Sequence, residues 1–309
     1  MGFKLKMATN KNSSYFSPIT IEDKDLITSF TLQSVFCNCD FSFANMCSWQ
    51  FLYDSEYMIK DGFLLIRFRI EDKSRFAYMF PIGNGDFDKI IKFIEEDSIA
   101  NGSPLLLLGI APEAKQRLET VFPEIFEFTP KRDYFDYIYL RDDLEFLKGK
   151  KLQSKRNHIN KFNSLYKYEY IPITPEIVPM CMELETLWYI NHTEDNENRL
   201  QAERHSMTYA LNNYDRLGII GGAIKVDNEI VAFTYGAPIN DKTFGVHVEK
   251  ANINYTGAYP IINKEFVSRL PKEYIYINRE EDLGLPGLRK AKLSYNPFKL
   301  LEKYAAIRK

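Results

Sequence analysis

The fold is decided by the strand-like run Tyr274-Ile275-Tyr276-Ile277 and the charged stretch after it, Asn278-Arg279-Glu280-Glu281-Asp282-Leu283-Gly284-Leu285-Pro286-Gly287-Leu288-Arg289-Lys290-Ala291-Lys292-Leu293-Ser294-Tyr295-Asn296-Pro297. Aromatic and β-branched residues at 274–277 predict a buried strand. The acids and bases therefore leave that strand at its C-terminal end, where open α/β sheets bind ligands. Two glycines and a proline between acids and bases are typical of a shaped loop. The same charges also suit a surface turn with ordinary ion pairs.

The composition indicates a folded globular protein. Of 309 residues, 45% are hydrophobic, 15% aromatic and 27% charged, which excludes a disordered or fibrous chain. This length suits one large domain or two of about 150 residues, and we favour two. The formal charge of −2 excludes a globally basic nucleic-acid binder but permits a local basic patch.

The cysteines do not predict a metal site. Cys37 and Cys39 are separated by one residue, whereas zinc knuckles use two, and no second pair follows. We expect reduced, mostly buried thiols and no bound metal. No apolar run approaches the roughly 18 residues of a membrane span, and no hydrophobic region follows Met1–Lys6. We therefore expect a cytoplasmic protein.

The first half predicts alternating helices and strands. Thr20 and Asp23 predict a capping box at the start of a helix within 18–35. Asp61-Gly62 between apolar runs predicts a hairpin. The other expected elements are a helix at 41–53, hairpin strands at 57–60 and 63–68, a strand at 76–82, a helix at 86–96, a strand at 105–108, a helix at 112–121 and a strand at 134–140.

The second half repeats this order. Pro172-Ile173-Thr174 echoes Pro18-Ile19-Thr20 ahead of another helix. Its expected elements are helices at 176–190 and 200–213, a hairpin of 217–226 and 229–235, a strand at 243–249, a helix at 257–270 and the strand at 274–277. The sequence predicts an α+β fold of two similar domains, 1–146 and 147–309, each a mixed sheet covered by helices, with the cleft in the second.

A basic segment joins the two halves. Seven Lys, Arg and His residues occur between Leu147 and Phe162 without an acid. Apolar residues at helical spacing, Leu152, Ile159 and Phe162, predict a face that docks on a core. The basic groups on the other faces, within Lys148–Lys161, suit phosphate, tRNA or an acidic head group. The alternative is a solvated helix between domains.

Three blocks carry a family resemblance. They are Lys148-Gly149-Lys150 with residues 155–162, Glu249-Lys250-Ala251 with Gly257-Ala258-Tyr259, and residues 278–292. Together they resemble the C-terminal domain of bacterial phosphatidylglycerol lysyltransferases. The resemblance implies a tandem GNAT-like (acyl-CoA N-acyltransferase) fold, akin to Fem peptidyltransferases. It also implies transfer of an activated acyl or aminoacyl group to a small amine or hydroxyl acceptor.

The sequence departs from related enzymes in two ways. It lacks the transmembrane helices that precede the membrane-bound enzymes' catalytic domain, which leaves peripheral contact with a membrane surface open. It also lacks the coenzyme A loop of ordinary acetyltransferases, because Asn254 replaces the Arg or Gln and bulky Tyr259 stands last. We expect no tightly bound cofactor, and aminoacyl-tRNA or acyl-CoA as the donor.

Acyl transfer needs a base, an oxyanion-stabilising group and an acid for the leaving group. His247 and Glu249 are expected to share one strand face, and either suits the base. Glu280 and Asp282 at the strand end are expected in the pocket, and a tyrosine such as Tyr295 suits the acid. Packing, ion pairs or solvent exposure are the alternatives for each.

Further residues are predicted to bind substrate. Arg289 and Lys292 are three apart, hence on one face of a helix, and suit phosphate or carboxylate. Trp188 is expected in the core and His192 at the helix cap. The other predicted substrate-binding residues come from the resembling blocks and their surroundings: Arg156, Asn157, Lys250, Tyr255, Gly257, Tyr259, Asn278 and Arg279.

Two functions fit these observations. The first is a soluble aminoacyl- or acyltransferase of bacterial type. The second is a non-catalytic module that binds an anionic small molecule or lipid head group, favoured by the degraded pyrophosphate loop. Stabilisation by a donor would favour the enzyme.

Overall fold

The computed structural model describes residues 15–70, 72–190 and 197–309, which form two compact units. Each unit has its own sheet. The first contains the described residues up to Ser34, Gln50–Pro130 and Lys303–Lys309, and the second contains Val35–Trp49 and Lys131–Glu302. No helix in these described ranges is long and apolar enough to cross a bilayer.

Most elements of the first unit occur in the predicted order, but the helix predicted at 41–53 is divided between the units and the strand predicted at 134–140 lies in the second. The helical turn Ile21–Asp23 begins with the expected capping box, because the Thr20 N–H donates to Asp23 Oδ2 at 2.8 Å and the Thr20 side chain accepts from the Asp23 N–H. The elements are β1 (Ser17–Pro18), η1 (Ile21–Asp23), α1 (Lys24–Thr31), α3 (Gln50–Tyr53), β2 (Glu56–Lys60), β3 (Phe63–Ile70), β4 (Arg75–Tyr78), β5 (Ile82–Gly83), α4 (Phe87–Ala100), β6 (Leu106–Ile110), α5 (Pro112–Val121), β7 (Phe126–Pro130) and β15 (Tyr304–Arg308).

The second unit holds the remaining elements. They are η2 (Cys39–Phe41), α2 (Phe43–Ser48), η3 (Arg132–Tyr134), β8 (Asp136–Leu140), α6 (Arg141–Phe146), η4 (Lys150–Leu152), α7 (Gln153–Leu165), β9 (Tyr168–Pro172), α8 (Val178–Ile190), α9 (Glu197–Asn212), α10 (Tyr214–Leu217), β10 (Ile220–Val226), β11 (Glu229–Pro238), β12 (Thr243–Ala251), α11 (Ala258–Arg269), β13 (Tyr276–Asn278), α12 (Pro286–Leu293) and β14 (Lys299–Leu301).

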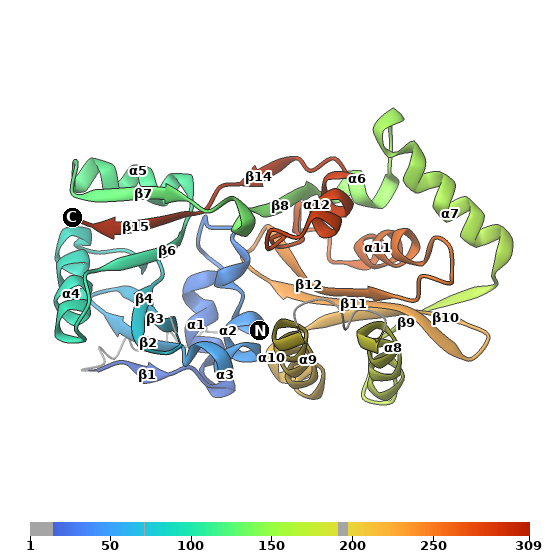
Figure 1. The fold of residues 1–309 in the computed structure, drawn as a ribbon, viewed down its shortest axis with the longest axis horizontal. Helices are drawn as coiled ribbons and strands as arrows, with labels where there is room; N and C mark the ends of the chain where they lie inside the picture. The colour runs from blue at the N-terminus through green and yellow to red at the C-terminus, as the bar shows by residue number, and fades with distance from the viewer. Residues whose placement is uncertain (1–14, 71, 191–196) are drawn as a thin grey trace, which may run out of the picture. The chain divides into compact units, whose positions relative to one another are not determined.

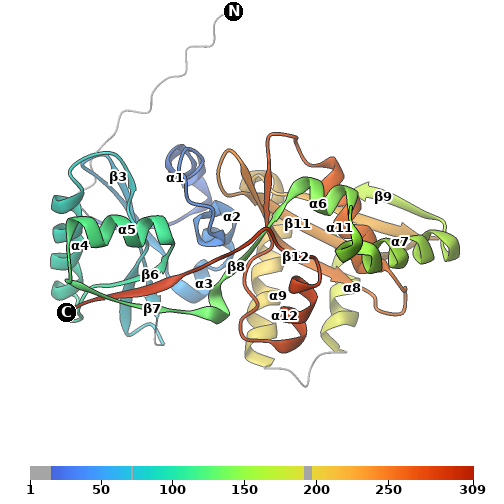
Figure 2. The ribbon, with the colours of Figure 1, turned by 90° about the horizontal axis from the view of Figure 1, so that it is seen from above.

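The two sheets have matching strand orders, which confirms the predicted duplication. One runs β1-β2-β3-β4-β6-β15-β7 and the other β9-β10-β11-β12-β13-β8-β14. In each, the fourth and fifth strands pair in parallel and the other described neighbours are antiparallel. The sixth strand is exchanged between the halves: β15 lies between β6 and β7, and β8 lies between β13 and β14 (Figures 1 and 2).

This exchange moves the division of the chain away from the predicted boundary between 146 and 147. Strand β8 precedes that boundary but pairs with β13 and β14, so it belongs to the second unit's sheet. Residues 303–309 lie after the boundary and belong to the first unit. A local sequence pattern can predict that a segment forms a strand. It cannot predict which sheet the strand joins, because that depends on contacts with residues far away in the sequence.

The second unit's sheet is covered on both faces. Helices α7, α11 and α12 lie on one face, and α8 and α9 lie on the other (Figure 1). The core on the α11 face includes Phe162, Phe244 and Phe266, each at most 1% exposed. Burying a side chain of this size stabilises the fold by roughly 1.5–3 kcal/mol, so α7 is held to the core as its apolar spacing predicted.

Candidate active site

The site lies where β12 and β13 separate. Their parallel pairing ends at Gly245 and Asn278. Beyond this point β12 continues along β11 to Ala251, whereas the chain after β13 turns into the charged loop. Where the two strands separate, no backbone hydrogen bonds join them. Side chains from both strands can then extend into the gap, which makes it a suitable place for a ligand.

A β-bulge changes the faces on which the β12 side chains lie. Val246 pairs with Gly236 and Val248 with Tyr235, so His247 has no opposite residue. Gly236 permits this close approach, because a β-carbon there would lie 1.8 Å from the carbonyl oxygen of Gly245. Bulges redirect side chains near active sites.

The expectation that His247 and Glu249 share one face is therefore wrong. His247 and Val248 line a cavity on the α9 face. Glu249 accepts a hydrogen bond from Asn263 of α11, on the opposite face. Strict alternation holds only in an unbulged strand.

Two side-chain bridges cross the gap, one on each face. His247 Nδ1 lies 2.8 Å from Glu280 Oε1, and Arg279 Nη2 lies 2.8 Å from Glu249 Oε1. The histidine and arginine side chains are only 5% and 10% exposed. The side chains of Arg279 and Glu280, which are consecutive residues after β13, thus lie on opposite faces of the sheet. The backbone of Glu280 has φ of 56°, a strained value for a residue with a β-carbon.

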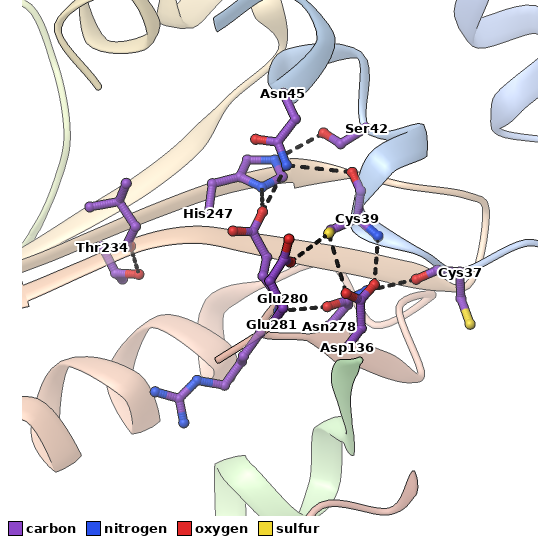
Figure 3. A network of polar contacts seen from close by, with 12 residues as sticks. Cys37, Cys39, Ser42, Asn45, Asp136, Thr234, His247, Asn278, Glu280 and Glu281 are labelled. Atoms are coloured by element: carbon purple, nitrogen blue, oxygen red, sulfur yellow. Dashed lines mark hydrogen bonds and ion pairs between the residues drawn. The ribbon is translucent and has the colours of Figure 1, made fainter. Parts of the chain in front are cut away.

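On the α9 face, His247 is held in a polar chain (Figure 3). Its Nε2 lies 2.9 Å from Ser42 Oγ, and the Glu280 carboxylate also accepts from Asn45 Nδ2 at 2.7 Å. If the carboxylate accepts from Nδ1–H, Nε2 is the basic nitrogen and accepts from the Ser42 hydroxyl. This Ser-His-Glu order suits proton transfer.

A cavity of about 40 Å³ adjoins this chain. Glu203 of α9 lines it and also binds Lys250 at 2.5 Å. The Lys250 ammonium lies 3.2 Å from the centre of the Trp188 ring, a cation–π contact. Lys250 is thus buried next to the cavity, and the other cavity-lining residues are Ala44, Asn45, Ser48, Trp49, Ser206, Tyr235, His247, Val248 and Glu280.

Next to the Ser42–His247–Glu280 contacts, Asn278 at the end of β13 is hydrogen-bonded to Asp136 at the start of β8 (Figure 3). Asp136 Oδ2 accepts from Cys39 N–H and from Asn278 Nδ2, both at 2.8 Å. Asn278 Oδ1 in turn accepts from Glu280 N–H at 2.7 Å, which sets the loop conformation. Cys39, Asp40 and Asp136 bring potential metal-ligand atoms within 4.8 Å of one another, although the cysteine spacing predicted no metal.

The predicted pocket residues Asp282, Arg289 and Lys292 form an internal cluster. Arg289 donates to both carboxylate oxygens of Asp282, at 2.9 and 2.7 Å. Lys292 is buried and donates to the carbonyl oxygens of Arg279 and Glu281 at 2.5 Å. Asp282 and Arg289 thus pair with each other, and Lys292 donates to backbone carbonyl groups, so substrate binding by the three stays a prediction.

Other predicted residues lie near α7 and the start of α11. Arg156 donates to the carbonyl oxygens of Leu147 and Gly149 and to Gln153, with Asn157 beside it. Tyr255 donates to Glu229, and Tyr259 accepts from Trp188. These contacts join neighbouring elements. His192 lies outside the described residues.

Helix α7 covers the N-terminus of α11, where a phosphate would otherwise bind. Gly257 precedes α11 with φ of 96°, and a β-carbon there would lie 2.5 Å from the carbonyl oxygen of His158. Phe162 also approaches this point, at 3.0 Å. An acceptor oxygen and an aromatic side chain in this place disfavour a pyrophosphate.

Replacing Gly257 by alanine is expected to loosen α7. The substitution combines strain from positive φ with a backbone clash, and should cost at least about 1–3 kcal/mol of unfolding free energy in urea denaturation. Gly287→Ala is the matched control, because nothing lies within 4 Å of a β-carbon there. Equal stability of both variants would contradict the close contact.

Sequence reasoning missed several residues of the site. Ser42, Asn45 and Glu203 reach the gap from distant parts of the chain, for which local patterns give no signal. Lys155 had a signal. It falls three residues after Leu152 and four before Ile159, on the apolar face of the helix, and it is partly buried, whereas Lys161, the other lysine of α7, is exposed.

Comparison with known proteins finds a family whose model matches most of the chain. The family model described as "Phosphatidylglycerol lysyltransferase, C-terminal" matches residues 35–307. A crystal structure of a conserved protein of unknown function from Bacteroides thetaiotaomicron is 50% identical, with a TM-score of 0.92, over 95% of this chain and 99% of that chain.

More distant relatives agree on the fold. L-PGS from Bacillus licheniformis is 15% identical, with a TM-score of 0.65, over 96% of this chain and 94% of that chain. This likeness concerns the fold alone, and together with the two matching sheets it confirms the predicted α+β fold of two similar domains. An uncharacterized protein of Mycoplasmoides gallisepticum is 26% identical over 175 residues, 55% of this chain, and the chain spans about half (54%) the length of that relative.

Proposed function

Because the chain belongs to the phosphatidylglycerol lysyltransferase C-terminal family, we propose that it transfers an aminoacyl group from an activated ester to an amine or hydroxyl acceptor. The observation that carries this proposal is the hydrogen-bonded chain Ser42–His247–Glu280 beside the gap between β12 and β13. It supplies a base with an oriented imidazole at a point where a substrate can enter between two strands.

In the proposed reaction, the attacking acceptor group passes its proton to Ser42 Oγ while the Ser42 hydroxyl passes its own proton to His247 Nε2, which lies 2.9 Å away. The acceptor's nitrogen or oxygen forms a bond to the ester carbonyl carbon, and the bond from that carbon to the leaving oxygen breaks. The imidazolium then returns its proton to the leaving hydroxyl. Glu280 stabilises the imidazolium, and Ser42 and Asn45 hold the His247–Glu280 pair in place.

The donor in this proposal is an aminoacyl-tRNA. The close approach of the His158 carbonyl oxygen to Gly257, at the start of α11, supports an aminoacyl ester over acyl-CoA, since a carbonyl oxygen repels a phosphate. The exposed lysines of the basic segment, such as Lys148, Lys151 and Lys161, suit the tRNA backbone. A small-molecule or lipid acceptor fits the family.

The test is transfer from labelled donors. The protein is incubated with tRNA carrying radiolabelled amino acids, or with labelled acetyl-CoA, and with anionic phospholipid vesicles or small amines. We expect labelled product from the charged tRNA and none from acetyl-CoA. The proposal fails if only acetyl-CoA reacts, or if no donor reacts while anions still stabilise the protein, which would favour the binding module.

A further inference from the structure

The site depends on a short segment that is far from it in the sequence. Residues Val35–Trp49, which we call the strap, belong to the second unit, although the residues on either side of them belong to the first. The strap supplies Ser42, which contacts His247, and Asn45, which donates to Glu280. The chain of polar contacts is therefore complete only when the strap is held in one position.

Asp136, at the start of β8, anchors the strap. Its Oδ2 accepts from the Cys39 N–H at 2.8 Å, and its Oδ1 lies 3.4 Å from the Cys39 sulfur. Both side chains are buried. Hydrogen bonds from N–H groups to a carboxylate are strong, and more so away from water. Asp136 thus fixes the backbone of the strap three residues before Ser42.

The same carboxylate also fixes the loop after β13. Asp136 Oδ2 accepts from Asn278 Nδ2 at 2.8 Å, and Asn278 Oδ1 accepts from the Glu280 N–H at 2.7 Å. Asn278 Nδ2 also donates to the carbonyl oxygen of Cys37 in the strap, at 2.7 Å. Asp136 and Asn278 therefore connect the strap with the loop that carries Glu280 (Figure 3).

The loop conformation requires such support. Glu280 has φ of 56°, and a residue with a β-carbon keeps such a value only where several contacts impose it. Its N–H is held by Asn278, and its carbonyl oxygen accepts from the Tyr137 N–H at 3.1 Å. Strand β8 thus fixes Glu280 twice, directly through Tyr137 and through Asp136 by way of Asn278.

His247 is sensitive to the positions of the strap and the loop. Its Nε2 is 2.9 Å from Ser42 Oγ and its Nδ1 is 2.8 Å from Glu280 Oε1. A movement of about 1 Å on either side would break one of these hydrogen bonds. A displacement of this size at a reacting group costs about 10²-fold in rate. The anchor therefore bears on the chemistry although it is remote from it.

We propose that Asp136 is a positioning residue for the general base. It acts through Asn278 on the loop and through Cys39 on the strap, so that both nitrogens of the His247 ring keep their partners. The effect on transfer rests on the proposed function, whereas the effect on the His247 contacts rests on the geometry alone.

A metal ion is the rival explanation for the buried carboxylate. Cys39, Asp40 and Asp136 bring potential ligand atoms within 4.8 Å of one another. However, Asp136 Oδ2 accepts from two N–H groups and Oδ1 faces the Cys39 thiol, so both oxygens have hydrogen-bond partners. These contacts favour the positioning role. The two roles differ in what an asparagine at this place would do.

The test compares Asp136→Asn with Asp136→Ala in the transfer assay with tRNA carrying radiolabelled amino acids. Asparagine keeps an oxygen that accepts from both N–H groups, so its kcat should stay within about threefold of wild type. Alanine removes the acceptor, and kcat should fall about 10²-fold. KM should change less than about threefold in both, because the anchor does not touch the substrate.

Asp142→Ala is the matched control. Asp142 is an exposed carboxylate on α6, directly after β8, and its variant should keep the wild-type kcat. If Asp136→Ala does not fold, Asn278→Ser gives the same test from the other side of the anchor. It breaks the link to the Glu280 N–H and leaves Asp136 its contact with the strap, and it should lower kcat in the same way.

The ring N–H of His247 gives a readout that does not need transfer. The proton that Glu280 accepts should give a proton NMR signal that is shifted downfield and exchanges slowly with water. His247→Gln assigns the signal. Asp136→Ala should broaden or lose it while the backbone amide spectrum stays that of a folded protein, and Asp136→Asn should keep it.

Several results would overturn the inference. One is wild-type kcat and an unchanged signal in folded Asp136→Ala or Asn278→Ser. Another is loss of activity in Asp136→Asn together with loss of wild-type activity in EDTA that added Zn²⁺ restores, which would make Asp136 a metal ligand. Failure of the proposed function is distinguishable. A signal that responds as expected, without transfer from any donor, would reject the reaction and leave the anchoring of His247 in place.

Discussion

His247→Gln is expected to lower kcat/KM for aminoacyl transfer by about 10²–10⁴-fold, the usual contribution of a general base. Glutamine keeps a polar side chain of similar size but cannot accept the proton that the reaction moves. In free energy this is about 2.7–5.5 kcal/mol of lost transition-state stabilisation. The measurement is initial rate against donor concentration, with circular dichroism to verify the fold.

His205→Gln is the matched control, because His205 is exposed on α9 and lies outside the hydrogen-bonded chain. It should retain the wild-type rate. Glu280→Gln should fall between the two, since it keeps a hydrogen bond to the ring but removes the charge that stabilises imidazolium. A His247→Gln rate within threefold of wild type would remove this residue from the chemistry.

Asp282→Ala is expected to destabilise the second unit by about 3–5 kcal/mol, the cost of removing one partner from a buried ion pair. Asp282 is 0% exposed and accepts from Arg132, Arg289 and Tyr137. Burial alone would raise its pKa, but hydrogen bonds from Arg289, Tyr137 and the Gly284 amide and the charge of Arg132 outweigh it and hold the pKa well below its usual range.

The sign of the pH effect follows from that depressed pKa. The carboxylate contributes stability above the unfolded-state pKa of about 4, and this contribution is lost as the pH falls towards the lower folded-state pKa. Urea denaturation at pH 7 should therefore show the full difference between wild type and Asp282→Ala. The difference should shrink in acid.

Asp133→Ala is the control for this cluster. Its carboxylate also binds Arg289, at 2.8 Å, but the side chain is 57% exposed. Water screens such a pair, so a loss of about 1 kcal/mol or less is expected. Similar losses for both variants would mean that burial does not govern this cluster. A large loss of activity in Asp282→Ala at unchanged stability would return Asp282 to the active site.

Much of the fold could be predicted because its local signals are strong. Asp61 and Gly62 both take positive φ, as the hairpin sequence requires, and the element order was enough to identify the duplication. Short strands such as β1, β7 and β14 were missed because two to five residues carry too little periodicity. The helix expected over 41–53 is two helices, α2 and α3, with a break at Trp49.

Sequence reasoning predicted several residues of the site, but not the faces on which they lie or their distant partners. His247 and Glu249 were predicted from their alternation along one strand and Glu280 from its place after another, and the structure brings all three to one gap. Their faces were not predictable, because a bulge depends on how β11 pairs with β12. Ser42 is 205 residues from His247 in the chain, and a hydrogen bond of that range leaves no trace in local composition.

The exchanged sixth strands have a consequence for synthesis on the ribosome. Strand β15, residues Tyr304–Arg308, fills the place between β6 and β7. The first sheet therefore cannot close until residues 304–308 have been translated, long after its other strands have emerged. Until then two strand edges stay open, which is the condition in which nascent proteins aggregate or recruit chaperones.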